Sequence, residues 1–435
     1  FFMAMDGKEL VEKLAKLSQV QSIKDIPQLT HALFPGTHCP LMGAAMAVGG
    51  IKDSLIVVVG TDECTYYTKS MTIHSEKFGG IDGRCVSVVL DDHDVTFGSA
   101  EKVQESFKEI IEEYRPQCVF LVTTCVIEII GDDFDAISEG LSELYGIPVL
   151  PVHTEHFKCE DHLPGLERTI TVCAEMMKSC DSDNSVNLLG QRMGDFATTE
   201  LYAMLQKAGV KIGLQLPCGC SVDDIKNAAA AKVNIVVNDI ALPLAQKMQE
   251  KFGIPYVYFN KFVIPEKIYE AYKNLFGYLE LELPGELEGL YQNAREKIEK
   301  NKGELEGITY IYGNTPYAVF EMNCFLSSLG MVPQVIQTNR YTEADEPYAK
   351  EILQYTDPYV CKAANIAPLQ YVYDVLSPYL YLGHEFGNRL RQKGIAIVHS
   401  DRASGMLGFE VTGYLLQQLV KSVREAKEYR KELGL

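Results

Sequence analysis

The most constraining feature of this sequence is the alternation of short β-branched runs with longer amphipathic stretches along the whole chain. Strands and helices that alternate in this way are typical of βα units, in which parallel strands form a sheet covered by helices. Strands are predicted at 54–60, 84–90, 117–123, 147–152, from 186, near 210–214, 233–237, 255–258, 308–312, 332–337, 379–382 and 394–398. Helices are predicted between them, for example at 100–113 and 133–145. The pattern indicates an α/β protein with parallel sheets.

The strand groups divide into three similar α/β modules. A chain of 435 residues corresponds to two to four domains at roughly 100–200 residues each. Segment 181–185 is a polar break, and the long charged helical stretch that follows 265 separates the last two modules. We expect a first Rossmann-like domain over 1–183, a second over 184–265, a helical connector over 266–305 and a third domain over 306–435.

Charge and composition limit the classes of binding partner and the cellular compartment that we expect for this chain. The formal net charge is −19, which disfavours nucleic acid and anionic membrane surfaces as partners. No apolar run approaches the roughly 18–20 residues that a membrane-spanning helix needs. The N-terminal segment has no signal-peptide profile, so the 12 cysteines are expected to be reduced thiols of a cytoplasmic protein.

Several common catalytic motifs are missing from the sequence. No GxxxxGK[ST] segment occurs, and no GxGxxG segment follows a predicted strand. GxSxG and HExxH are absent as well. We therefore expect no nucleotide to be bound by this chain, although the modules have a nucleotide-binding type of architecture.

Three cysteines lie where a parallel sheet places its ligands. Cys39 lies on a Gly- and Pro-bearing loop before a helix of small residues, Cys64 follows strand 54–60, and Cys125 follows strand 117–123. Open α/β sheets bind ligands beyond the carboxyl ends of their strands. Helix N-termini at that edge would stabilise thiolates and an anionic iron–sulfur core. From the residues alone, metal ligands and buried structural thiols both remain possible.

The motifs around these cysteines resemble those of the nitrogenase component 1 superfamily. The segments that carry the resemblance are CPLMGAAMAVGGI, GTDECTYYTK, LDDHDVTFGSAEKV, TTCVIEIIGDDFDAI and VNLLGQRMGDFATTELYAMLQKAGVKI, followed by KMQEKFGIPYVYFN and LGHEFGNRLRQKGIAIVHSDRASGMLGFEVTGYLLQQL. That superfamily includes nitrogenase molybdenum–iron protein subunits, their cofactor-assembly scaffolds, and protochlorophyllide and chlorin reductases. The resemblance covers nearly the whole chain and implies three Rossmann-like domains with parallel sheets.

The resemblance also implies a site and its partners. Cys39, Cys64 and Cys125 match the cysteines that bind an iron–sulfur cluster, [4Fe-4S] or a larger P-cluster-like one, at the interface between two homologous subunits. A homodimer or a heterodimer would satisfy the ligand count. Electrons would come from a separate iron-protein-like ATPase reductase. Relatives usually carry Gly before the second cysteine, whereas this chain has Asp62 and Glu63, which leaves an oxygen ligand or solvated acids as alternatives.

Other residues form weaker candidates for a second metal or substrate site. They are His153, His156, Cys159 and His162 in one loop, Cys218 and Cys220 in a CxC segment, and His384 at a strand-to-helix turn. Imidazoles and thiols at such spacing suit a transition metal, although a hydrophilic loop and structural thiols explain the same pattern. The remaining thiols are expected in the core: Cys85, Cys118, Cys173, Cys180, Cys324 and Cys361.

The expected function is that of a nitrogenase-like oxidoreductase subunit. Its cluster would pass low-potential electrons, under anaerobic conditions, to a substrate or metallocofactor in an interdomain cavity. The resemblance places the cysteine and histidine ligands of the nitrogenase cofactor at Ala245 and Leu407, so neither ligand is present. A scaffold for metal-cluster assembly without turnover of its own is the alternative, and a redox-inert binding protein is the third interpretation. The catalytic residues and the substrate are not evident from the sequence.

Overall fold

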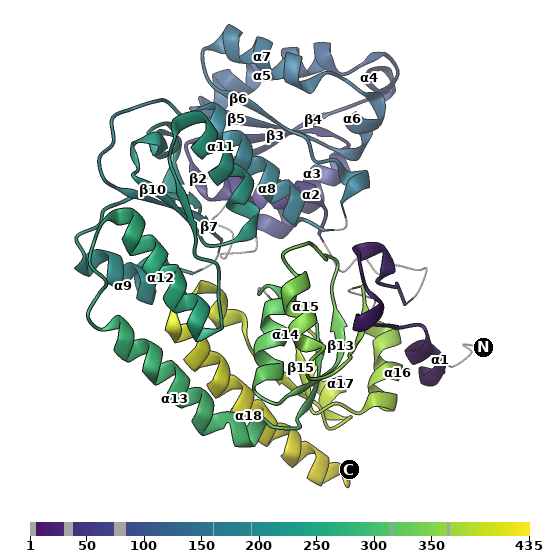
Figure 1. Ribbon diagram of the computed structural model, residues 1–435. Coiled ribbons are helices and arrows are strands. Elements are labelled where there is room, and N and C mark those ends of the chain that lie inside the picture. The colour runs from purple at the N-terminus through teal and green to yellow at the C-terminus, as the bar shows by residue number, and fades with distance from the viewer. Residues whose placement is uncertain are drawn as a thin grey trace.

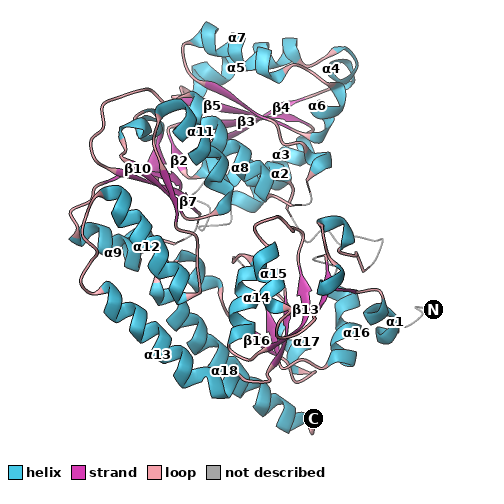
Figure 2. Cartoon of the chain, in the orientation of Figure 1, coloured by secondary structure: helices cyan, strands magenta, loops and turns pink. Residues whose placement is uncertain are grey.

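Three mainly parallel sheets, each covered by helices, make up the protein (Figures 1 and 2). The computed structural model describes residues 6–29, 38–73, 84–159, 161–192, 194–313, 315, 317–362 and 366–435. The expected α/β fold class with parallel sheets is therefore confirmed. None of the helices in these ranges is long and apolar enough to cross a membrane.

The first sheet has the strand order β4-β3-β5-β6, and all its pairs are parallel. Its strands are β3 (Ser54–Gly60), β4 (Cys85–Val89), β5 (Cys118–Thr123) and β6 (Val149–Val152). Every residue of β3 and of β5 is buried, as expected for strands with helices on both faces. The helices of this unit are α2 (Pro40–Gly49), α3 (Asp62–Ile73), α4 (Asp92–Phe97), α5 (Ala100–Tyr114), α6 (Cys125–Ile130), α7 (Phe134–Tyr145) and α8 (Leu163–Val172).

The second sheet has the order β11-β10-β7-β8 and is also parallel. Its strands are β7 (Val186–Gln191), β8 (Ile212–Pro217), β10 (Val233–Val236) and β11 (Tyr256–Tyr258). Its helices are α9 (Glu200–Lys207), α10 (Val222–Lys226) and α11 (Leu242–Phe252). A short parallel pair, β2 (Ile51–Lys52) with β9 (Cys220–Ser221), joins this unit to the first one.

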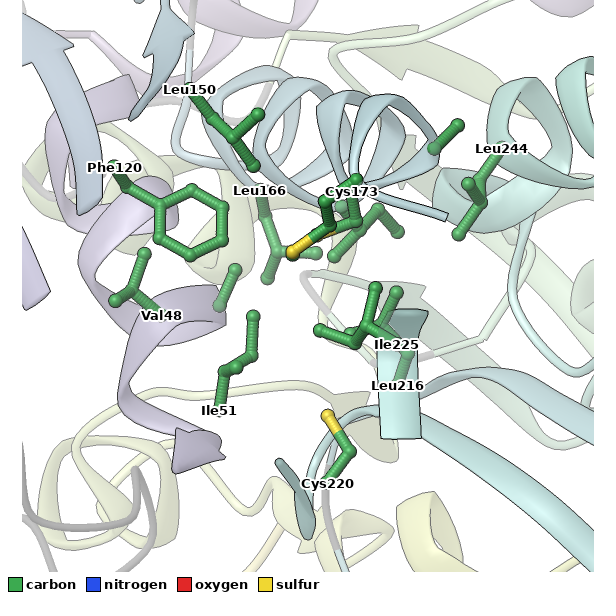
Figure 3. Close-up of a cluster of buried hydrophobic side chains, with 14 of the residues drawn as sticks. Val48, Ile51, Phe120, Leu150, Leu166, Cys173, Leu216, Cys220, Ile225 and Leu244 are labelled. Atoms are coloured by element: carbon green, nitrogen blue, oxygen red, sulfur yellow. The ribbon is translucent and has the colours of Figure 1, made fainter. Parts of the chain in front are cut away.

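The first two units share one hydrophobic core. Side chains from α2, β5 and α8 pack in the same cluster as side chains from β8, α10 and α11 (Figure 3). This cluster includes Val48, Phe120, Leu166, Leu216 and Leu244. Because packed interiors resist displacement, the first two sheets are held in one fixed arrangement.

The third sheet has six strands in the order β1-β14-β13-β12-β15-β16. The strands are β1 (Ala15–Lys16), β12 (Thr309–Tyr312), β13 (Val332–Gln337), β14 (Tyr359–Cys361), β15 (Leu380–Leu382) and β16 (Ala396–Val398). The helices around them are α1 (Gly7–Glu12), α14 (Val319–Ser328), α15 (Glu346–Ile352), α16 (Ile366–Leu376), α17 (Gly387–Arg391) and α18 (Phe409–Leu433). The expected strands of this module are present, and β1 and β14 add to them.

The N-terminal segment lies on the third sheet rather than on the first. Strand β1 pairs with β14 in antiparallel orientation, and α1 packs against α16 (Figure 1). Segment 266–305 forms most of two helices, α12 (Pro265–Leu279) and α13 (Leu287–Leu305), and α13 packs against α18. The exact domain borders remain a prediction, since the segment that contains β1 belongs in space to the last module.

One buried carboxyl in α14 makes the stability of the third unit depend on pH. Glu321 is 4% exposed, and its Oε1 accepts a hydrogen bond of 3.4 Å from the Val263 amide. Burial raises the pKa of Glu321 from its usual 4.5 to about 7, and the nearby Lys267 only partly offsets this effect. Between about pH 4.5 and 7 the folded protein keeps the Glu321 proton, whereas the unfolded chain has released it. The free energy of unfolding therefore falls as the pH rises through this range.

We therefore expect E321Q to flatten the pH dependence of unfolding. From pH 4.5 to 7 the wild type should lose free energy of unfolding on the order of 3 kcal/mol relative to E321Q. Urea titrations of both proteins at a series of pH values measure this difference. If the free energy of unfolding depended on pH in the same way in both proteins, the raised pKa of Glu321 would be contradicted.

Candidate functional site

Each of the three predicted ligand cysteines lies at the N-terminus of a helix. Cys39 is the residue before α2, Cys64 is the third residue of α3, and Cys125 is the first residue of α6. All three side chains are half-buried. Helix N-termini carry partial positive charge and free backbone N–H groups, so each of these positions suits an anionic ligand.

The pairing of β3 with β5 brings Cys64 and Cys125 to the same edge of the first sheet. These strands are parallel neighbours with Val59 opposite Thr123, and a cysteine-bearing helix follows each of them. The Thr124 hydroxyl donates a hydrogen bond of 2.9 Å to the Val59 carbonyl and so ties the two strand ends together. Both burial and the neighbouring Cys64 raise the pKa of the Cys125 thiol. The structure thus places these two thiols within electrostatic range of each other.

Cys39 is held in position by an unusually close contact between α2 and α8. A Cβ atom on Gly43 would overlap the carbonyl oxygen of His162, and one on Gly165 would overlap the Pro40 carbonyl. Only glycine at these points allows the two helix backbones to approach so closely. The first turn of α2, which follows Cys39, therefore rests on α8; most of the Gly- and Pro-bearing loop before Cys39 lies outside the described residues.

The second cysteine has its own hydrogen-bond donor. The Thr61 hydroxyl donates to the Cys64 sulfur over 3.5 Å. Asp62 and Glu63 are exposed in the first turn of α3, where carboxylates stabilise a helix through its dipole. Their exposure agrees with the interpretation that they are solvated acids.

Glu128 links the Cys125 helix to the loop that follows β6. Its carboxylate accepts hydrogen bonds from the Thr154 hydroxyl at 2.8 Å, from the His156 amide at 2.9 Å, and from the Glu155 amide. The Thr123 hydroxyl donates to the same carboxylate at 3.1 Å. This residue was not singled out in the sequence, because its partners lie about 25 residues away and only the fold brings them together.

The histidines and the cysteine of that loop point to different partners. His153 Nε2 lies 3.2 Å from Asp135 Oδ1, whereas the Cys159 sulfur lies 3.6 Å from the Thr154 carbonyl oxygen and 3.6 Å from an Arg168 nitrogen. His162 is half-buried, and burial lowers its pKa to about 4. The predicted second metal site in this loop therefore gains no geometric support.

Within the described ranges, one group of three or more possible ligand atoms lies within 4.8 Å, namely Asp91, His93 and Asp94. Lys102 already neutralises both of these carboxylates, at 2.8 and 2.7 Å. Cys39, Cys64 and Cys125 do not form such a compact group, so they are not arranged to bind a single ion together. A polynuclear iron–sulfur cluster binds each cysteine through a different iron atom and tolerates wider spacing.

The two thiols of the CxC segment have different surroundings. Cys218 is half-buried and donates to the Arg192 carbonyl at 3.2 Å. Cys220 lies in the shared core beside Ile51 and Ile225, and Cys173 lies in the same cluster (Figure 3). Burial raises the pKa of Cys220 to about 12, so this thiol is protonated at neutral pH and suits a core residue better than a ligand.

His384 lies in a surface pocket at the carboxyl ends of β15 and β16. The pocket has a volume of about 130 Å³, and it is lined by His384, Glu385, His399, Ser400 and Asp401 among others. His384 Nε2 lies 3.3 Å from Asp401 Oδ1, and the imidazole is 70% exposed. The remaining thiols expected in the core are buried, except Cys180, which is exposed because the polar segment that contains it runs over the surface.

Three α/β units with mainly parallel sheets, in which a half-buried cysteine lies just before or within the first turn of three helices, define a class of proteins built on Rossmann-like sheets. The family model for nitrogenase component 1 type oxidoreductase matches residues 39–424. The chain belongs to this family.

Curated relatives include proteins of cofactor assembly and of nitrogenase itself. The chain is 31% identical to the nitrogenase iron-molybdenum cofactor biosynthesis protein NifE of Clostridium pasteurianum over 224 residues, 50% of this chain and 49% of that protein. It is 24% identical to NifE of Rippkaea orientalis over 331 residues, 72% of this chain and 69% of that protein. It is 24% identical to the nitrogenase molybdenum-iron protein alpha chain of Methanosarcina barkeri over 330 residues, 72% of this chain and 62% of that protein.

The first of these matches spans about half the length of the relative, and the other two span about two thirds. Among solved structures, "Nitrogenase Cp1 at pH 6.5" has a TM-score of 0.78 with 15% sequence identity. That match covers 92% of this chain and 94% of the other. At this identity the likeness shows the fold.

The close contact of α2 with α8 can be tested with a matched pair of glycine substitutions. We expect G43A to destabilise the protein by about 1–3 kcal/mol, since the added methyl group meets backbone atoms that cannot move aside. Gly289 in α13 has open space around it, and G289A should be neutral or stabilising by up to about 1 kcal/mol. Chemical denaturation measures the free energy of unfolding of both variants. Equal changes in this free energy for G43A and G289A would contradict the close approach of α2 to α8.

Proposed function

We propose that this chain is an iron–sulfur subunit of the nitrogenase component 1 type, in which Cys39, Cys64 and Cys125 hold a cluster at the interface with a homologous subunit. The observation that supports the proposal most is that all three thiols are half-buried and lie just before or within the first turn of a helix. When bound, such a cluster would supply one-electron transfer at low potential.

The surrounding residues suit an anionic cluster. The helix N-termini direct backbone N–H groups and positive dipole ends toward it, and the Thr61 hydroxyl donates to the Cys64 sulfur. Glu128 holds the loop after β6 against the Cys125 helix and so restricts movement of the sulfur. Three cysteines leave a cubane one ligand short, so a ligand from elsewhere, such as a paired subunit, completes the proposed site.

Between the two roles considered, we favour assembly of a metal cluster over catalytic turnover. The relatives named as cofactor biosynthesis proteins support this choice. The structure adds that Leu407, which matches a histidine ligand of the nitrogenase cofactor, is fully buried in the core around α12. A cofactor held by that histidine therefore has no counterpart here, while a cluster in transit needs no permanent ligand at this point.

A two-component reductase is the second candidate. The nitrogenase molybdenum-iron protein alpha chain matches over as much of this chain as the biosynthesis protein of Rippkaea orientalis. In that case an iron-protein-like ATPase would deliver the electrons. ATP-dependent substrate reduction with such a partner would favour the reductase, whereas transfer of a bound cluster to an apoprotein would favour the scaffold.

The cluster proposal predicts that each cysteine of the trio is needed for iron. C39S, C64S and C125S, purified anaerobically, should each lose most of the iron and the broad visible absorption of the wild type. Cys180 is exposed and lies outside the site, so C180S is the matched control and should keep both. Full iron content in the three variants, or an iron-free wild type after anaerobic purification, would refute the proposal.

Two exposed tyrosines next to Cys64 mark the proposed subunit interface. Tyr66 and Tyr67 are 64% and 67% exposed on α3, and their rings pack edge to face at 5.6 Å. Aromatic side chains are enriched where subunits bury each other's surface. A homologous subunit that covers them would also cover the half-buried thiol of Cys64.

The double variant Y66S/Y67S should therefore weaken subunit association and iron retention together. The effect is measured by sedimentation of the chain alone and with a co-expressed homologous subunit. Tyr355, which is 56% exposed in the third unit, provides the control variant Y355S. Loss of iron with unchanged association, or wild-type behaviour in both assays, would contradict the interface.

A further inference from the structure

The carboxyl edge of the second sheet gathers charged residues that the cluster proposal does not use. Arg192 follows β7, Asp239 follows β10, and Lys261 follows β11, three neighbouring strands of the parallel sheet. Ligands of open α/β sheets bind at this edge, beyond the carboxyl ends of the strands. The sequence analysis did not single out these residues, because they lie far apart in the chain.

Lys261 is a buried cation without an acidic partner. Its side chain is 7% exposed, and its Nζ donates to the backbone carbonyl of Ser404, which belongs to the 3₁₀ turn Asp401–Gly405 between the third sheet and α18. No carboxylate of the described residues forms an ion pair with it. Burial, together with the charge of Arg192, lowers the pKa of Lys261 to about 7.

Arg192 is the second cation at this edge. It is half-buried, and burial lowers its pKa, while Asp239, Cys218 and Asp161 act on it only through their charges. Among the residues that the structure describes, its guanidinium has neither a hydrogen-bond acceptor nor an ion pair. Asp239, an acid at the same edge of the sheet, is already paired with Arg340 at 3.1 Å.

Lys261 is buried and Arg192 is half-buried, and neither forms an ion pair among the described residues, which is costly for the folded state. An anion bound between the two groups would offset this cost. A guanidinium presents several N–H donors in one plane and binds oxyanions in a bidentate manner, while an ammonium adds a point charge. Because Arg192 is only half-buried, a small ligand can reach it from solvent.

We propose that Arg192 and Lys261 form a binding site for a small oxyanion, such as a phosphate or a carboxylate, at the carboxyl edge of the second sheet. The turn that contains Ser404 covers the site from the third unit, where Gly405 also accepts a hydrogen bond of 3.4 Å from Gln191. A bound anion would therefore join the second unit to the third. This inference does not depend on the cluster at the cysteine trio.

The test is a binding titration on the purified full-length chain with inorganic phosphate and, separately, with malonate. Thermal unfolding at constant ionic strength, adjusted with sodium chloride, should show stabilisation by at least one of these anions. Equilibrium dialysis should give one anion per chain. Phosphate binding without malonate binding would assign the site to phosphate groups, and the opposite result would assign it to carboxylates.

The variants R192Q and K261M should each weaken anion binding about tenfold or more, since a hydrogen bond to a charged group is lost. Both should unfold no more easily than the wild type in the absence of anion, because the unpaired charge is gone. Lys211 forms an exposed ion pair with Asp183 on the surface, so K211Q is the matched control and should bind as the wild type does. No response of the wild type beyond that to sodium chloride, or unchanged binding in R192Q and K261M, would overturn the site.

Discussion

The parallel pairing of β3 with β5 is the interaction on which the candidate site depends. Both strands are fully buried, and their register is set by apolar side chains on both faces. A slip by one residue would turn every side chain to the opposite face and is therefore strongly disfavoured. Because the two strand ends are fixed, the helices that follow them begin side by side, and Cys64 and Cys125 are brought to one edge. The third thiol depends on a different contact, the glycine-mediated approach of α2 to α8.

The same core that fixes the cysteines also connects the first two units. The third unit meets the second in a separate hydrophobic cluster, where Leu407 and Phe409 pack, and through polar contacts at two helix ends. Glu200 at the start of α9 accepts a hydrogen bond of 3.0 Å from the Phe409 amide, and Glu410 accepts one of 3.1 Å from the Glu200 amide. Each carboxylate thus caps the helix to which the other belongs. Leu407 lies between them in the core, which explains why the position of a nitrogenase cofactor ligand serves packing in this chain.

The fold class and most of the strands could be predicted from the sequence. Buried parallel strands are short apolar runs, and the helices between them are amphipathic, so both are visible in the local order of residues. The sequence did not predict that the N-terminal strand β1 joins the third sheet, because a two-residue strand has no periodicity of its own. For the site, the motif pattern singled out Cys39, Cys64 and Cys125, and their role as cluster ligands stays a prediction. The contacts of Glu128, Arg192 and Lys261 could not be predicted, because they arise from residues distant in sequence. Cys220 lies in the core, which agrees with the structural-thiol alternative for the CxC segment.

The account as a whole depends on one cluster bound by three sulfur atoms. The most direct measurement is a crystal structure of the anaerobically purified protein, with anomalous scattering data collected on both sides of the iron absorption edge. The account predicts a strong iron peak in contact with the sulfur atoms of Cys39, Cys64 and Cys125, at a surface that a second subunit covers. An anomalous map without iron at these cysteines, in a protein that was never exposed to oxygen, would contradict it.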